Sequence, residues 1–219
     1  DKIDALYEEY NHTKDPAKRK VIYKKIDSVS GVASKYAIAN EYDKMMTAMG
    51  AQGTNAFTSF EKTVYTDDVP ANAINKYIAV QSERFRNPVL RIFHTELEAV
   101  YEEKNRSLDS DNSEVFETLF SELFKKHTYG LQTTIGTVEH LKNPSLKEIR
   151  KYFQTYYVPN NMAVILAGDF NPDKAIAEID KAFSYMQPKP VPQYTFEKEA
   201  PITAPIIKKV VGPDAGSVS

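Results

Sequence analysis

The 219-residue sequence contains no cysteine, which excludes disulfides and thiolate metal sites within it. No apolar run approaches the ~20 residues that span a bilayer, so no transmembrane segment is expected. The formal net charge is only -2, and the basic stripe of a general nucleic-acid binder is missing. HExxH, HxxEH, GxSxG and a Gly-rich phosphate loop are absent as well. What remains has the composition of a globular protein, with 42% hydrophobic and 26% charged residues.

Helix signals recur along most of the chain. Asp15-Pro16 predicts a helix start, and Asn40 is expected to cap a second helix that stops at Gly50. Later helices are predicted over 71–86, from about Ile92 to Ser110, after Asn112 or Ser113, after Ser145, and after Asn171.

Two segments favour strands instead. Residues 54–66 are rich in β-branched and aromatic side chains, and a turn at Ser59-Phe60-Glu61 would fold them into a hairpin. Residues 161–168 form a short continuous apolar run, which predicts a strand buried on both faces. The predicted class is therefore α+β, with a mixed or antiparallel sheet packed against several helices.

The C-terminal part differs in amino-acid composition from the rest of the sequence. Six of the twelve prolines lie between Pro188 and Pro213, so residues 187–205 are predicted to be an extended linker. Ile206 to Val211 then resembles a new strand. The predicted division is residues 1–186 as an incomplete N-terminal domain, 187–205 as the linker, and 206–219 as the first strand of a following, truncated domain.

Glu96 and Glu103 are the first candidates for chemistry. Seven residues is nearly two helical turns, so both carboxylates leave one helix face, together with Ala99 and Val100. Such a pair suits a metal ligand with a supporting acid, but Glu-rich solvent faces are common, and spacing alone favours that plainer interpretation.

A second candidate is the polar strand that contains Asn55, Ala56, Phe57 and Thr58. A strand of this kind at a sheet edge can pair with an extended peptide through its main chain, although a plain edge strand is the commoner case. The histidines His12, His94, His127 and His140 are each expected to be structural or surface residues rather than ligands.

Read in order, a series of segments resembles the pitrilysin/insulinase metallopeptidases, also called inverzincins. They are 53–59, Thr63-Val64-Tyr65, 85–88, Glu96-x-x-Ala99-Val100-x-x-Glu103, His127-x-Tyr129-Gly130, Gly136-Thr137, Tyr156-Tyr157-x-Pro159-x-Asn161 and Gly168-Asp169-Phe170. The resemblance covers roughly residues 40–186 and implies the mitochondrial-processing-peptidase-like fold. The long lead-in before residue 40 is similar to that of the large bacterial members.

The resemblance implies a zinc site of two His from an HxxEH helix plus a later Glu, which falls here on Glu103. Glu96 would be the acid that orients a zinc-bound His, and Asn55 to Thr58 would hold the substrate backbone. Because HxxEH is absent, the chain is expected to be a fragment of a zinc metalloendopeptidase that binds no zinc and cleaves no peptide alone.

The alternative is a non-catalytic homologue that acts as a partner or structural subunit. The expected partners are a peptide substrate, bound as an added strand, and the second half of the parent chain. No nucleic-acid partner is expected. Exposed apolar surface would favour self-association of the fragment. The large bacterial type suggests the bacterial envelope or periplasm, with the cytoplasm as the other option.

Overall fold

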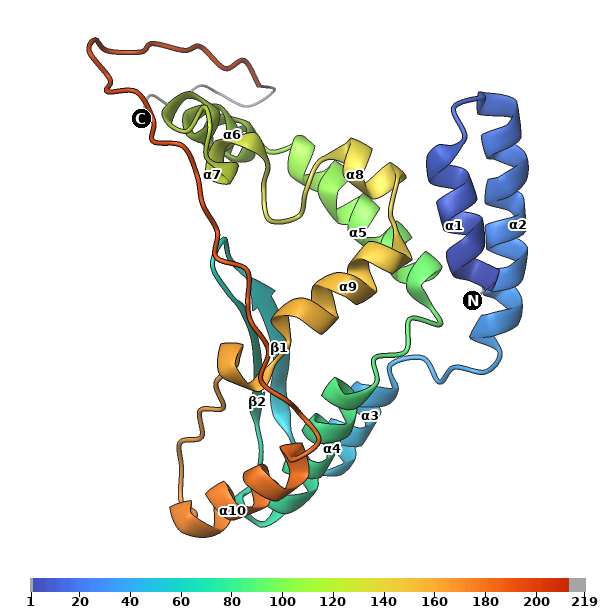
Figure 1. Cartoon of the computed structure of the whole chain (residues 1–219), viewed down its shortest axis with the longest axis vertical. Coiled ribbons are helices and arrows are strands. Elements are labelled where there is room, and N and C mark those ends of the chain that lie inside the picture. The colour runs from blue at the N-terminus through green and yellow to red at the C-terminus, as the bar shows by residue number, and fades with distance from the viewer. Residues whose placement is uncertain (1, 213–219) are drawn as a thin grey trace.

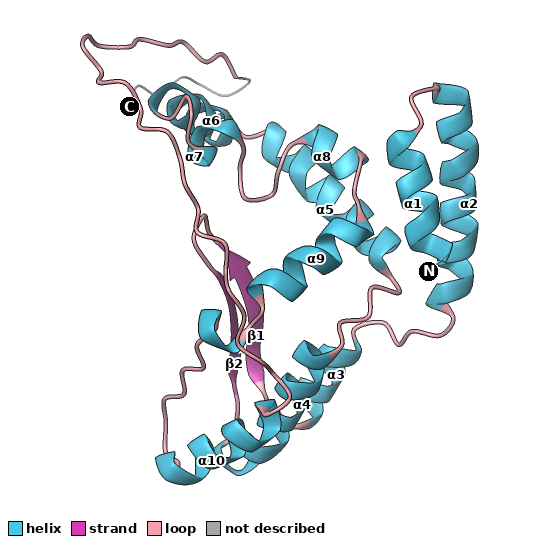
Figure 2. Cartoon of the chain, in the orientation of Figure 1, coloured by secondary structure: helices cyan, strands magenta, loops and turns pink. Residues whose placement is uncertain are grey.

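The computed structural model describes residues 2–212, and helices dominate it (Figures 1 and 2). The α-helices are α1 Lys2–His12, α2 Pro16–Ser34, α3 Glu41–Ala48, α4 Ile74–Arg86, α5 Phe93–Leu108, α6 Asp111–Leu123, α7 Thr128–Leu131, α8 Val138–Lys142, α9 Leu146–Tyr156 and α10 Pro172–Phe183. Short 3-10 helices cover Ala71–Ala73 and Pro159–Asn161, and the strands are β1 Gln52–Thr58 and β2 Thr63–Asp68.

The two strands form an antiparallel hairpin, as predicted for residues 54–66. Thr58 lies opposite Thr63, and the Ser59 N–H closes the turn by donating to the Lys62 carbonyl at 2.8 Å. A register irregularity between Gln52 and Asn55 bulges the start of β1, where Gly53 has φ +60°. A small antiparallel sheet among many helices confirms the α+β class.

The best-buried core lies where the α1–α2 hairpin meets α9 (Figure 1). Its fully enclosed members are Tyr7, Ile26 and Leu146, which come from these three helices. Sequence reasoning predicted α2 and α9 but assigned nothing to α1. Different helices lie near the sheet and in the part of the chain around it. Helix α3 contacts β1, and α10 packs on α4.

Helix starts follow the capping signals in most places. Asp15 accepts from the N–H groups of Ala17 and Lys18, while Ser145 and Asn171 cap α9 and α10. The prediction for Asn40 is wrong in its mechanism, because Asn40 adopts a left-handed conformation and its side chain makes no cap bond. Helix α6 is capped by Ser110 rather than by Asn112 or Ser113.

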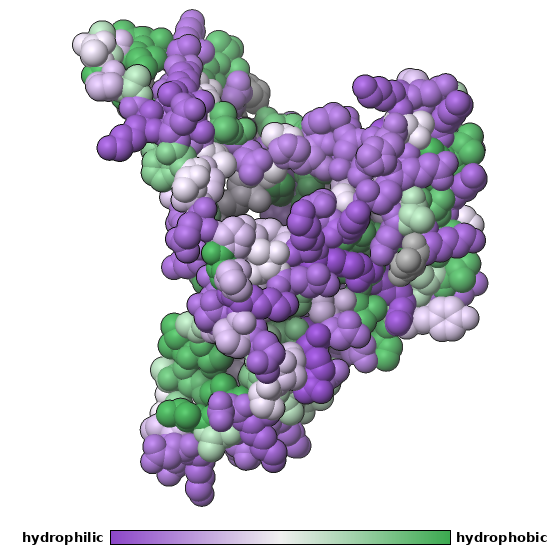
Figure 3. All heavy atoms as spheres, in the orientation of Figure 1, coloured by the Kyte–Doolittle hydropathy of each residue, from purple (hydrophilic) through white to green (hydrophobic). Residues whose placement is uncertain are grey.

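The predicted strand at 161–168 is wrong for this structure. Residues 162–168 form no strand, since within residues 2–212 only β1 and β2 pair with each other. Ile165 is 88% exposed, and hydrophobic residues gather on the surface near α10, where Val164 and Ile176 are exposed too (Figure 3). A fully apolar strand needs neighbours on both edges and both faces, and the described chain supplies none.

The predicted strand at Ile206 to Val211 is likewise absent over the described residues 206–212, for the same lack of a pairing partner. Residues 213–219 lie outside the described part, so the proposed division at 187 and 206 stays a prediction. No helix between residues 2 and 212 is both long and apolar enough to cross a membrane.

Candidate peptide and metal site

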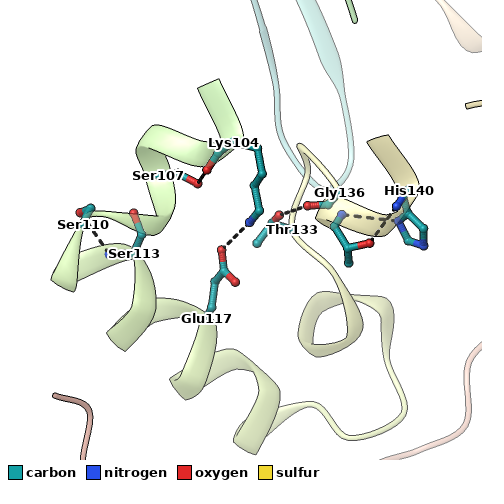
Figure 4. A network of polar contacts seen from close by, with 9 residues as sticks. Lys104, Ser107, Ser110, Ser113, Glu117, Thr133, Gly136 and His140 are labelled. Carbon is teal, nitrogen blue, oxygen red and sulfur yellow. Dashed lines mark hydrogen bonds and ion pairs between the residues drawn. The ribbon is translucent and has the colours of Figure 1, made fainter. Parts of the chain in front are cut away.

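The rotation of α5 is set by its buried residues. His94 and Lys104 are both buried, and the Lys104 ammonium pairs with the Glu117 carboxylate of α6 at 2.9 Å (Figure 4). At the other end of the helix, the Tyr7 hydroxyl lies 2.8 Å from His94 Nδ1. At about 100° per residue, these anchors turn the opposite side of α5 away from the rest of the protein.

Glu96 and Glu103 lie on that opposite side. Both belong to the single helix α5 and both are exposed, as are Ala99 and Val100 between them. Helical geometry separates the two acids by only about 20° around the axis, so they share one face. Within residues 2–212 neither carboxylate has an ion pair or a hydrogen-bond partner, and both are available to a group from outside.

The described residues alone do not fit a zinc ion. Zinc sites in proteins take three or four ligands in tetrahedral geometry. Between residues 2 and 212 there is no group of three His, Asp or Glu side chains that could hold a metal ion. Glu103 could therefore contribute one ligand but cannot build the site, and no chemical step through zinc follows from these residues.

Three of the four histidines have partners within the described residues. His94 Nδ1 lies 2.8 Å from the Tyr7 hydroxyl, and its Nε2 lies 3.8 Å from Glu98 and 3.9 Å from Asp27. His140 completes a capping box with Thr137 at the start of α8. His127 accepts the Tyr129 N–H at 3.2 Å and caps α7.

Strand β1 presents the peptide-binding candidates on a free edge. Asn55, Ala56, Phe57 and Thr58 are all exposed. Because Ser59 and Lys62 form a hydrogen-bonded pair, alternation turns the backbone groups of Phe57 toward β2 and those of Ala56 and Thr58 toward the outer edge. In agreement with this, the Ala56 N–H does not donate to β2. It donates to the Asn55 side-chain oxygen at 2.8 Å.

Sequence reasoning missed the residues that hold this hairpin in place. Arg84 of α4 lies between the rings of Tyr42 and Tyr65, 4.2 and 4.5 Å from their centroids. The Tyr65 and Tyr157 hydroxyls meet at 2.9 Å, and burial together with that bond raises the pKa of Tyr157. Only the aromatic character of these positions signalled a packing role, since their partners come from distant segments.

Known proteins with similar sequences and structures point in one direction. The family model described as "Insulinase (Peptidase family M16)" matches residues 30–137, and "Peptidase M16 inactive domain" matches residues 144–218. The chain is 27% identical to the zinc protease PqqE of Helicobacter pylori over 84% of its own length and 42% of that protein's length.

Two further matches agree. The chain is 28% identical to the probable zinc protease PqqL of Haemophilus influenzae over 73% of its length, but over only 17% of that protein's length. The crystal structure of a protease from Helicobacter pylori superposes with a TM-score of 0.66 at 28% identity, covering 71% of this chain and 38% of the other. The chain thus spans less than half the length of these relatives.

Proposed function

Because this chain belongs to the insulinase-type M16 peptidase family, we propose that it is part of a zinc-dependent metalloendopeptidase that hydrolyses peptides or unfolded polypeptides. In this proposal β1 holds the substrate backbone, and the exposed face of α5 forms one wall of the metal site. The HxxEH helix, which the sequence lacks, would come from another segment of the whole protein.

One observation carries the proposal: within residues 2–212, both the outer edge of β1 and one face of α5 are left open. The β1 edge turns the backbone of Ala56 and Thr58 outward. The α5 face offers Glu103 and Glu96 without a partner between residues 2 and 212. The family resemblance, rather than the exposure of this helix face alone, is the reason to assign Glu96 and Glu103 to a site.

The residues of β1 would act by binding and orienting the peptide. An incoming strand would form main-chain hydrogen bonds with Ala56 and Thr58, and the Asn55 side chain would have to release the Ala56 N–H first. Phe57, which is 49% exposed, offers an apolar contact beside that edge.

The residues of α5 would act on the metal site. Glu103 would supply a carboxylate ligand, and Glu96 would hold the orientation of a metal-bound imidazole. Bound zinc would supply an activated water for hydrolysis.

On its own, the chain should bind no stoichiometric zinc and cleave no peptide, since one carboxylate gives little affinity. Isothermal titration calorimetry with zinc checks this expectation. A one-to-one site of submicromolar affinity in the isolated chain would refute the assignment of a single ligand.

In a polypeptide that carries both this chain and an HxxEH helix, Glu103→Gln should weaken zinc binding and abolish hydrolysis, and Glu96→Gln should have a milder effect. Glu102→Gln is a matched control, because Glu102 is the adjacent exposed acid on α5 but lies outside the face of Glu96 and Glu103. Wild-type turnover in purified Glu103→Gln protein would eliminate Glu103 as a ligand.

A second candidate function is that of a non-catalytic partner subunit. The observation in its favour is that neither the sequence nor the described structure contains the histidine pair. If the encoded residues of the whole protein include no HxxEH, and zinc does not bind it, this candidate replaces the peptidase.

A further inference from the structure

A second binding feature lies away from α5, at the tip of the β1–β2 hairpin. Here a cavity of about 460 Å³ opens between the hairpin turn, the α6–α7 connection and the C-terminal segment. In Figure 1 this segment (red) continues from α10 toward α6 and α7. This cavity is open to solvent, so a side chain from outside the chain could enter it.

Aromatic rings form most of the cavity wall. The buried His127 ring lies 4.1 Å from the ring of Tyr129, 4.4 Å from Phe196 and 5.4 Å from Tyr194, measured between centroids. Phe124 adds another ring at 6.0 Å. Aromatic faces carry partial negative charge and attract cations.

Two carboxylates complete the wall. Glu61 follows β1 in the hairpin turn and accepts a hydrogen bond from the Tyr129 hydroxyl. Glu199 accepts from the backbone N–H groups of Lys126 and His127 at 2.8 and 2.9 Å. These bonds hold the pKa of Glu199 below its ordinary value, so its charge persists at neutral pH.

The cavity wall therefore has a negative balance. The nearby Lys126 ammonium pairs with Glu197, 2.7 Å away, and interacts with the Glu199 carboxylate only at longer range. The Tyr129 N–H donates to His127 Nδ1 at 3.2 Å, so this ring nitrogen is already engaged within the protein. Aromatic rings with two carboxylates suit an organic cation and disfavour an anion.

We propose that this aromatic pocket binds the guanidinium or ammonium group of an arginine or lysine side chain. Glu61 lies three residues beyond Thr58, so a peptide paired with the outer edge of β1 and continuing past Thr58 would reach the pocket. The pocket would then select a basic residue of the bound peptide. This last step, unlike cation binding itself, rests on the proposed strand addition to β1.

Nuclear magnetic resonance of the full 219-residue chain tests cation binding without any peptide. The probe is Nα-acetyl-arginine amide, with the citrulline analogue as its neutral isostere. With only four histidines in the sequence, their ring signals can be followed separately. We expect the arginine probe to shift the His127 signals and leave those of His12 unchanged, with citrulline at least about tenfold weaker.

Glu199→Gln is the informative variant. Its amide oxygen can still accept from Lys126 and His127, so the C-terminal segment stays in place while the charge is removed. Glu197→Gln is the matched control on the same segment, because Glu197 pairs with Lys126. We expect several-fold weaker arginine binding in the first variant only; equal binding of arginine and citrulline, or equal binding in both variants, would overturn the proposal.

A second experiment separates the pocket from strand addition. Two alternating Val-Thr decapeptides are compared, one with a single Arg and one with citrulline at that position. Tighter binding of the Arg peptide supports the full proposal. Equal binding overturns peptide selection by the pocket and leaves strand addition standing, whereas binding of the free arginine probe with no peptide binding overturns strand addition alone.

Discussion

The α1–α2–α9 core contrasts with two exposed surfaces, the outer edge of β1 and the Glu96/Glu103 face of α5: all three contain apolar side chains, but they are buried very differently. In the first region, apolar side chains such as Ile26 and Leu146 are almost fully enclosed by partners from within the chain. On the two exposed surfaces, Ala56, Phe57, Ala99 and Val100 are exposed, and the main-chain groups of β1 that face outward have no strand partner. The difference in burial separates residues that stabilise the fold of this chain from residues that are available to bind another molecule or another segment of a longer protein.

The largest expected effect is on the core. Ile26→Ala should lower the free energy of unfolding by about 2–5 kcal/mol, because it leaves a cavity in a fully buried site. Val100→Ala removes a similar side chain from the exposed face and should cost less than about 1 kcal/mol. Urea denaturation followed by circular dichroism measures both changes. Equal losses of unfolding free energy in the two variants would show that Val100 is as important for stability as the core.

The next effect tests the link between the core and α5. Tyr7→Phe removes the hydroxyl that contacts His94 Nδ1 and should cost about 1–3 kcal/mol, because a buried polar atom loses its partner. Tyr36→Phe is the control, since Tyr36 is 76% exposed. Denaturation midpoints that match between the two variants would contradict the importance of the Tyr7–His94 contact.

A pH dependence should follow from Tyr23 of α2. Burial, and then its hydrogen bond to Glu98 of α5, raises the pKa of Tyr23 to about 12. In an unfolded chain a tyrosine titrates near pH ~10. The neutral form is therefore favoured by the fold, and the stability it contributes is complete below pH ~10 and lost as pH rises toward 12.

Urea midpoints measured at pH 9 to 12 on wild type and Tyr23→Phe check this dependence. The variant should lose less stability over that window than the wild type. Parallel curves would mean that Tyr23 ionises in the folded protein as it does in the unfolded chain.

The smallest effect is expected at the acids themselves. Glu96→Gln and Glu103→Gln should each change the stability of this chain by no more than about 0.5 kcal/mol, since both side chains are exposed and unpaired within residues 2–212. Thermal unfolding measures it. A large loss in either variant would make that acid structural and would remove the reason to assign it a site role.

Local signals in the sequence predicted much of the fold. Asp15-Pro16, Ser145 and Asn171 marked helix starts because caps act on neighbouring backbone groups. The hairpin at 54–66 followed from β-branched residues around a short turn. The strand predicted at 161–168 failed because a strand depends on partners, and the sequence of this segment does not specify whether partners are present.

The candidate site was predictable only in part. Helical spacing placed Glu96 and Glu103 on one face of α5, but their separate roles came from the resemblance to the insulinase family and stay a proposal. The Asn55 contact with the Ala56 N–H and the aromatic pocket around His127 could not be predicted. The Asn55 contact is local but depends on the rotamer that Asn55 adopts, whereas the pocket joins segments more than 60 residues apart.

The most direct test of the account is amide hydrogen exchange of β1 with and without the Arg-containing Val-Thr decapeptide. Strand addition predicts that the peptide protects the Thr58 amide, and raises protection of Ala56, because both face the outer edge. The Phe57 amide faces β2 in either state and should barely change. Peptide binding that leaves Ala56 and Thr58 unprotected would contradict the assignment of β1 as the substrate-binding edge.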